Sequence, residues 1–260
     1  MISIVIPYYN RRQLLLNTLK SINRFKGDND IETIIIDDGS DREHHIADVK
    51  KKFPDLNINL IVLERDSKWR GACIAYNTGF KNAKGDIVII NSSECVHIGN
   101  VLDYIAENLT PDNYISFSTY EGDERITKCF TKTDWEASNI LYNLMESLFP
   151  MKNNWQSHTR EDKTKETFIP FCGAIYRSNM EKLSGYDERF VHGIGYDDYD
   201  FTDRILNLGL KRILVDEPFV VHQWHKPVVY SNNLNLDLLM FLRRFFPHRT
   251  KAVENKVYKI

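Results

Sequence analysis

Short apolar runs rich in β-branched residues, each followed by apolar residues at helical spacing, fill the first 110 residues of the sequence. These runs cover residues 2–7, 31–37, 58–63 and 87–90. After the first run, Leu15, Leu19 and Ile22 share one helical face, and Asn10 is the predicted cap of that helix. Strands that are apolar on both faces and alternate with helices are typical of a parallel sheet covered on two sides. The sequence therefore predicts an α/β fold with a mostly parallel central sheet flanked by helices.

The pattern changes along the rest of the chain. The second run precedes Ile46, Val49 and Phe53 on one helical face, and the third precedes a small-residue helix over 72–83. After residue 110 the regular alternation fades. The later predictions are a helix over 135–148 within a charged segment at 132–165, a strand at 171–176, a helix over 198–208 and a strand pair around Ile213 and Val220. We interpret the segment at 132–165 as an insertion.

Composition excludes several classes of function. The 260 residues carry a formal net charge of −2, whereas nucleic-acid binding needs a clear surplus of clustered Lys and Arg, so no nucleic-acid partner is expected. The four cysteines form no C-x-x-C pair, which argues against a zinc knuckle or a disulfide framework. No run approaches the roughly 18 apolar residues of a transmembrane helix, and no signal-peptide core is recognisable. We expect a cytoplasmic protein, at most peripheral to a membrane.

Polar residues gather where the predicted strands end. They are Tyr8, Tyr9 and Asn10 after the first strand, Asp37 and Asp38 at the end of the second, and residues 91–94 after the fourth. Ligands of such sheets bind beyond the carboxyl ends of the strands. The sequence therefore predicts a binding site at this edge.

Four segments resemble, in order and spacing, the family 2 glycosyltransferases with the GT-A fold. They are SIVIPYYNR at 3–11, IIIDDGS at 34–40, RGACIAYNTGFKNAKGD at 70–86, and FCGAIYRSNMEKLSGYDERF with GYDDYDFTDRI between 171 and 205. The resemblance runs from residue 1 to about 225. It implies one GT-A domain over 1–230, with a donor half at about 1–110 and an acceptor half at about 111–230, followed by a helical extension at 231–260.

The resemblance also implies a pocket for the donor nucleotide. Its residues are Pro7, Tyr8, Tyr9, Asn10, Asp37 and Asp38, together with Arg70 and Asn77. An aromatic face and a carboxylate that accepts from the base N–H suit this task. The alternative is a turn in which the two aspartates merely cap a helix. For the 70–86 segment, core packing explains the small residues equally well, so only Arg70 and Asn77 are proposed to bind.

Charge on the departing diphosphate is usually neutralised by Mg²⁺ or Mn²⁺ held on carboxylate oxygens. The family supplies a D-x-D motif after the fourth strand, but this sequence has Asn91-Ser92-Ser93-Glu94. Glu94 is thus the only anionic ligand expected there. By resemblance, His222 is the predicted second ligand, with His225 as the next choice and an ordinary core or surface histidine as the alternative for each.

Asp197 and Asp198 align with the acidic pair of the family, whose second member is the general base. Asp198 is expected to take the proton of the acceptor hydroxyl, and Asp197 to bind the acceptor or orient the loop. The alternative is a pair of helix N-terminal carboxylates facing the helix dipole. Gly173 is expected to let the chain pass near the acceptor sugar.

The predicted function is metal-assisted transfer of a sugar from a nucleoside-diphosphate donor, with a UDP-sugar favoured, to an acceptor hydroxyl of a glycan or another molecule, with inversion. Two alternatives remain. A pseudoenzyme with the same fold would bind nucleotide sugars without turnover. A nucleotidyltransferase should carry a Gly-rich loop after its first strand, and IPYYNRRQ has no glycine.

The last 30 residues combine aromatic and basic side chains. Phe241, Phe245 and Phe246 lie beside Arg243 and Arg244. We expect a terminal helix that packs on its own domain, with contact to a membrane or a partner chain as the alternative. The oligomeric state does not follow from the sequence.

Overall fold

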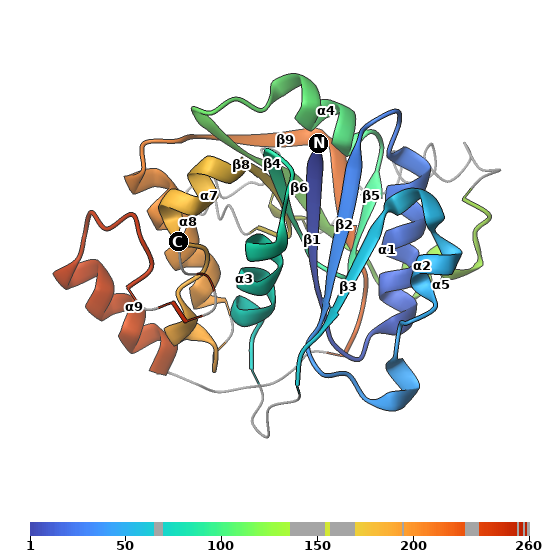
Figure 1. The fold of residues 1–260 in the computed structure, drawn as a ribbon, viewed down its shortest axis with the longest axis horizontal. Coiled ribbons are helices and arrows are strands. Elements are labelled where there is room, and N and C mark those ends of the chain that lie inside the picture. The colour runs from blue at the N-terminus through green and yellow to red at the C-terminus, as the bar shows by residue number, and fades with distance from the viewer. Residues whose placement is uncertain are drawn as a thin grey trace.

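The computed structural model describes residues 1–64, 70–135, 154–156, 170–193, 195–226, 234–253, 255–256 and 258. These residues form a nine-stranded sheet with helices on both faces (Figure 1). The strands are β1 (Ile2–Tyr8), β2 (Ile31–Asp37), β3 (Ile58–Val62), β4 (Ile87–Asn91), β5 (Cys95–Ile98), β6 (Asn113–Glu121), β7 (Asn154–Gln156), β8 (Cys172–Tyr176) and β9 (Lys211–His222). Their order is β3-β2-β1-β4-β8-β6-β9-β5, and β7 pairs with β6.

The first four strands of this order are parallel, as the sequence predicts. Ile2 of β1 lies opposite Ile31 of β2 and opposite Ile87 of β4. β2 pairs with β3 in the same sense. The carboxyl ends of β1, β2 and β4 therefore meet at one edge of the sheet.

The remaining strands make the sheet mixed. β8 runs antiparallel to both β4 and β6, and β5 runs antiparallel to β9. The predicted α/β sheet flanked by helices is thus confirmed, but it is mixed: the half from β3 to β4 is parallel, and so is the pair of β6 and β9. The predicted strand pair around Ile213 and Val220 is a single strand, β9, whose pairing with β6 shifts register between Phe117 and Thr119.

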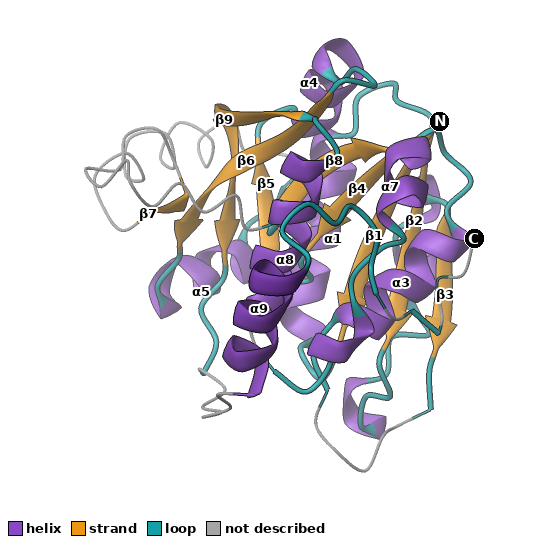
Figure 2. Ribbon diagram, turned by 90° about the vertical axis from the view of Figure 1, so that its left-hand side faces the viewer, coloured by secondary structure: helices purple, strands orange, loops and turns teal. Residues whose placement is uncertain are grey.

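Side chains of the parallel strands alternate between two cores. The helices of the described residues are α1 (Arg12–Phe25), α2 (Val49–Lys52), α3 (Cys73–Asn82), α4 (Val101–Asn108), α5 (Glu124–Lys132), α7 (Arg177–Leu183), α8 (Tyr196–Asn207) and α9 (Leu234–Phe245). In β1, Ile4 and Ile6 face a core with α1 and α4, whereas Val5 faces a core with α3, α7, α8 and α9. Figure 2 shows α8 and α9 side by side over one face. This is the two-sided cover that strands apolar on both faces require.

Two local predictions were wrong. Asn10 does not cap α1, because it adopts a left-handed conformation (φ 51°) and bonds Asp41 instead. The helix expected across Ile46 to Phe53 is reduced to α2, flanked by short 3₁₀ turns. Pro54 follows directly, and a residue before proline avoids helical backbone, which explains why α2 ends at Lys52.

The C-terminal helix packs on its own domain, as expected. Leu239 and Leu242 of α9 are buried in the core shared with α8. Its other face exposes Met240, Phe241 and Phe245, and contact of this face with a membrane or a partner chain stays an untested alternative. Among the described helices, none has both the length and the apolar character to cross a membrane. The helix predicted at 135–148 lies outside the described residues, apart from Trp135.

Candidate active site

A cavity of about 540 Å³ lies at the edge where β1, β2 and β4 end. It is lined by residues from both halves of the chain: Pro7, Tyr8, Tyr9, Arg11, Asp38, Arg70, Gly71, Ala72, Ala75, Tyr76, Ser92, Ser93, Glu94, Pro170, Phe171, Gly193, Gly195, Asp197, Asp198 and His225. Because β8 is antiparallel to β4, its beginning lies at the same edge, and the Ser92 amide donates to the Phe171 carbonyl at 2.8 Å. The two halves of the chain therefore meet around one space.

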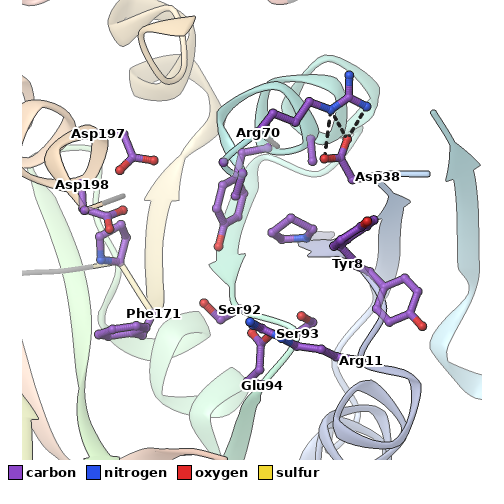
Figure 3. Close-up of a pocket in the computed structure, with 18 of the residues that line it drawn as sticks. Tyr8, Arg11, Asp38, Arg70, Ser92, Ser93, Glu94, Phe171, Asp197 and Asp198 are labelled. Carbon is purple, nitrogen blue, oxygen red and sulfur yellow. Dashed lines mark hydrogen bonds and ion pairs between the residues drawn. The ribbon is translucent and has the colours of Figure 1, made fainter. Parts of the chain in front are cut away.

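One wall of the cavity carries an aromatic ring and an ion pair. Tyr8 ends β1, and its hydroxyl donates to the His44 carbonyl at 2.6 Å. Burial, with a smaller contribution from the Asp37 charge, raises the pKa of Tyr8 to about 12, so its hydroxyl stays protonated. Asp38 binds Arg70 through Nε at 2.9 Å and through Nη2 at 2.6 Å (Figure 3). The ring of Tyr8 is itself almost fully buried, so this wall presents mainly the fixed carboxylate and guanidinium of Asp38 and Arg70, with the exposed Tyr9 nearby.

Asp37 and Asn10 shape this wall without lining the cavity. Asp37 is buried, and its Oδ1 accepts from the Ser40 amide at 2.8 Å. Asn10 donates to Asp41 Oδ2 at 2.7 Å and accepts from the Asp41 amide at 2.8 Å. Asp37 therefore stabilises the turn after β2, which was the alternative to nucleotide binding. Asp38 instead faces the cavity.

The floor of the cavity is the turn between β4 and β5. Ser92, Ser93 and Glu94 lie there, and Arg11 from the start of α1 forms an ion pair with Glu94 through Nη1 (Figure 3). Burial opposes ionisation of Glu94, but Arg11 and, to a smaller extent, His222 hold its pKa below the ordinary value. Glu94 is therefore a carboxylate whose charge is already matched by Arg11.

The opposite wall is the beginning of α8. Gly195 precedes the helix with φ 82°, a conformation that favours glycine, and Asp197 and Asp198 form the first turn. The Cys73 thiol donates to Asp197 Oδ2 at 3.3 Å, and the Tyr186 hydroxyl donates weakly to Asp198 Oδ1 at 3.5 Å.

Both carboxyls of this wall titrate above their usual range. Burial raises the pKa of Asp197 and, together with the neighbouring charge of Asp197, raises the pKa of Asp198 well above the ordinary value. Such perturbed carboxyls inside a cavity are typical of acid–base groups.

The two predicted histidines lie at the end of β9. His222 is buried against the Phe171 ring and does not line the cavity, whereas His225 does. Their ring centroids are 5.2 Å apart. Burial, partly offset by Glu94, lowers the pKa of His222 to about 4, so its imidazole is neutral at physiological pH.

Two predicted binding residues lie elsewhere. Asn77 is fully buried and bonds the backbone of Tyr186 and the carboxylate of Glu188. Gly173 lies within the sheet, where an added Cβ would meet the Tyr114 hydroxyl oxygen at 2.3 Å. Neither residue lines the cavity.

The floor fits a divalent cation poorly. Asn91, at the first position of the altered motif, is fully buried, and its Oδ1 bonds His97 Nε2 at 2.8 Å. Glu94 is engaged by Arg11. Across the described part of the chain, no group of three or more His, Cys, Asp or Glu side chains is arranged to hold a metal ion. A single engaged carboxylate is a weak donor set for Mg²⁺ or Mn²⁺, which favour several oxygen ligands.

Several lining residues, among them Arg11, Tyr76 and Phe171, were not predicted to belong to the site. Arg11 is the last residue of the SIVIPYYNR segment, and its position after a strand was the available signal. Tyr76 lies on α3 among small residues that also suit core packing, and Phe171 begins the fourth family segment within a predicted strand. For Tyr76 and Phe171 no pattern in the sequence separates a cavity residue from a core residue.

Comparison with known proteins places this geometry in a family. The sequence profile of glycosyl transferase family 2 matches residues 3–183, more than half of the chain. The uncharacterized glycosyltransferase YwdF of Bacillus subtilis (strain 168) is 27% identical over 200 residues, which cover 77% of this chain and 66% of YwdF. The amylovoran biosynthesis glycosyltransferase AmsB of Erwinia amylovora is 26% identical over 280 residues, covering 99% of this chain and 82% of AmsB.

Solved structures show the same fold at low sequence identity. The mannosyltransferase PcManGT from Pyrobaculum calidifontis, in complex with GDP-Man and Mn²⁺, matches with a TM-score of 0.57 at 19% identity over 86% of this chain and 57% of that chain. S. aureus TarS 1–349 in complex with UDP-GlcNAc matches with a TM-score of 0.65 at 14% identity over 93% of this chain and 64% of that chain. The chain thus spans less than two thirds of both structures and of YwdF. The GT-A fold is confirmed, and the chain belongs to glycosyl transferase family 2.

Proposed function

We propose that the chain transfers a sugar from a nucleoside diphosphate to an acceptor hydroxyl, with Asp198 as the general base. The observation that carries this proposal is that one cavity is lined by Tyr8 and Asp38 on one wall and by Asp198 on the other. A nucleotide on the first wall presents its sugar toward the second. The GDP-Man and UDP-GlcNAc named for PcManGT and TarS support a donor of this class.

The proposed chemistry is one displacement at the anomeric carbon. The acceptor oxygen forms a bond to that carbon as the bond to the diphosphate oxygen breaks, and the diphosphate leaves with the electron pair. The hydroxyl proton passes to the Asp198 carboxylate. Attack from the side opposite the leaving group inverts the configuration. The raised pKa of Asp198 suits this task, because a base with a higher pKa holds the proton more strongly.

Each wall has a proposed role. Tyr9, which is 37% exposed, offers its ring to the base beside the buried Tyr8. Asp38 accepts from the base, and Arg70 keeps the Asp38 carboxylate in place. Asp197, held by Cys73, fixes the first turn of α8. The base is proposed to be uracil. We propose no role for the metal predicted at Glu94 and His222, because the one carboxylate of the floor already forms an ion pair with Arg11.

The test is a panel of UDP-, GDP-, dTDP-, ADP- and CDP-sugars incubated with the protein and simple sugar acceptors, with and without Mn²⁺. Release of nucleoside diphosphate that depends on acceptor, and is lost in Asp198→Asn, supports the proposal. Tight binding of a donor without release by the unaltered protein would instead support a nucleotide-sugar-binding pseudoenzyme. Release of pyrophosphate from a sugar phosphate and a nucleoside triphosphate would favour a nucleotidyltransferase.

A further inference from the structure

The cavity floor has a cation of its own where the family places a metal. Arg11 lies at the beginning of α1, lines the cavity, and reaches Glu94 beside Ser92 and Ser93 (Figure 3). These are the residues that replace the D-x-D motif after β4. A guanidinium thus lies next to the position at which carboxylates would otherwise gather a divalent cation.

Among the described residues, the guanidinium of Arg11 uses one of its N–H donors in a hydrogen bond. It carries five N–H groups in a planar fork, and its one hydrogen bond to the described residues is from Nη1 to Glu94. About three tenths of the Arg11 side chain is exposed, against 9% for Glu94. Glu94 is therefore a largely buried counter-ion for Arg11, and the partly exposed Arg11 side chain lines the cavity.

The local field also favours an anion. α1 spans 14 residues, its first turn contains no acidic residue, and no side chain caps its N-terminus. The positive end of the helix dipole thus adds to the charge of Arg11 at this edge. Planar guanidinium donors match phosphate oxygens, often through two parallel hydrogen bonds.

We propose, building on the proposed function, that Arg11 rather than a divalent cation neutralises the diphosphate of the donor, with Glu94 positioning its guanidinium. As the bond between the anomeric carbon and the diphosphate breaks, the leaving oxygen gains negative charge, and the Arg11 N–H groups stabilise it. Glu94 is then a positioning residue and not a metal ligand. The reaction proceeds in the presence of a chelator.

The two roles of Glu94 predict opposite effects of Glu94→Gln. If Glu94 is the counter-ion of Arg11, the substitution removes a negative charge close to the diphosphate, so nucleotide affinity stays the same or rises. If Glu94 is the metal ligand, the substitution removes the one anionic donor of the floor, so Mn²⁺-dependent affinity falls. The sign of this change separates the two roles.

The experiment measures binding of UDP, GDP, dTDP, ADP and CDP by calorimetry, in EDTA and in Mn²⁺. For the diphosphate that binds most tightly, we expect affinities in the two buffers to agree within about twofold. Arg11→Ala should lower the affinity in both by about tenfold to a hundredfold, the range for a lost charge-assisted hydrogen bond. The affinity of Arg11→Lys should lie between that of the unaltered protein and that of Arg11→Ala. Arg24→Ala, which removes a charge from the last turn of the same helix, is the matched control and should bind normally, and thermal melts verify that each variant is folded.

Three outcomes would overturn the inference. Binding that requires Mn²⁺ and is lost in Glu94→Gln would restore the metal and leave the proposed function intact. Normal binding by folded Arg11→Ala would remove Arg11 from the donor site, again without harm to the proposed function. Failure of the unaltered protein to bind any of the five diphosphates in either buffer would overturn the donor site itself, and the inference with it.

Discussion

Glu94 and Asp198 line the same cavity from two distant parts of the chain. Glu94 lies on the turn after β4 and Asp198 in the first turn of α8, on the other side of the cavity beside Phe171 (Figure 3). This arrangement is the central requirement of the glycosyl-transfer hypothesis, since a leaving diphosphate and an attacking hydroxyl must reach the same carbon. Carboxylates on opposite faces of the molecule would have ruled it out.

Asp198→Asn should remove transfer while sparing donor binding. The amide keeps the shape of the side chain but cannot take the acceptor proton, and general bases contribute about 10²- to 10⁴-fold to rate. The measurement is kcat for nucleotide release alongside calorimetric affinity for the nucleoside diphosphate. Asp203→Asn, on the same helix but paired with Arg243 at the surface, is the control and should keep full activity. Equal kcat values for Asp198→Asn and Asp203→Asn would remove Asp198 as the base.

The raised pKa of Asp198 predicts opposite pH trends for activity and for stability. Activity needs the ionised carboxylate, so kcat/KM should rise with pH through a value above that of an ordinary carboxyl group. The folded state holds the Asp198 proton more tightly than the unfolded state does. The stability from this group is therefore complete below the unfolded pKa and is lost as pH rises through the folded pKa.

Asp198→Asn should accordingly gain stability over the unaltered protein as pH rises. We expect similar melting temperatures at low pH and a higher melting temperature for the variant at pH 8, because the amide has no charge to bury. Thermal melts of both proteins across this range provide the measurement. A difference that stays constant with pH would contradict burial of Asp198 as the cause of its raised pKa.

The Asp38–Arg70 pair should act as one unit in donor binding. Both side chains are nearly buried, at 11% and 13% exposed, and they share two short contacts. Asp38→Ala and Arg70→Ala should each weaken nucleoside diphosphate binding. The double variant should lose less than the sum, with a coupling of about 0.5–3 kcal/mol. The matched control is the exposed pair Asp123 and Arg125, for which both single variants should bind normally; strictly additive losses at Asp38 and Arg70 would count against a shared role.

The parallel half of the sheet was predictable, and the mixed half was not. In β1, β2 and β4 nearly every side chain is buried, so the sequence carries an uninterrupted apolar signal that implies cover on both faces. The direction of β8 has no such signal, because the run from Cys172 to Ile175 is apolar and buried, a pattern that does not distinguish one strand direction from the other. Pairing of β8 with β4 and β6 depends on long-range packing that no local pattern encodes.

The candidate site divides in the same way. Asp38 and Asp198 follow directly from motifs at the end of a strand and at the beginning of a helix, and both line the cavity. Asn77 matched a motif equally well, but its side-chain amide makes hydrogen bonds with the backbone of Tyr186 and does not line the cavity. Arg11 and Arg12 are adjacent in the sequence, and no local pattern tells which of them belongs to the site. In the structure Arg11 pairs with Glu94, whereas Arg12 pairs with the partly exposed Asp48.

Asn77→Ala should destabilise the fold without direct loss of donor contacts. Its amide group donates to the Tyr186 carbonyl at 2.9 Å and to Glu188 at 3.0 Å, and accepts from the Tyr186 amide at 2.8 Å. Each buried group left unsatisfied costs about 1–3 kcal/mol, so the melting temperature should fall by several degrees. Asn82→Ala, at the exposed end of the same helix, is the control. A stable Asn77→Ala protein with weakened nucleotide affinity would instead favour the binding role predicted from the sequence.

α9 should prove to be part of the domain and not an appendage. Leu239 and Leu242 are 3% and 2% exposed and pack in the core that also holds Phe201 and Ile205 of α8. Removing either side chain to Ala should lower the free energy of unfolding by about 2–5 kcal/mol, since the cavity left behind adds to the lost burial. Met240→Ser, which changes a residue that is 60% exposed on the same helix, should have an effect within about 0.5 kcal/mol. Denaturant unfolding of the three variants measures the difference. Because α8 also carries Asp198, loosening of α9 should lower kcat in Leu239→Ala and leave it unchanged in Met240→Ser; equal stability and activity in both would mean that the domain ends before α9.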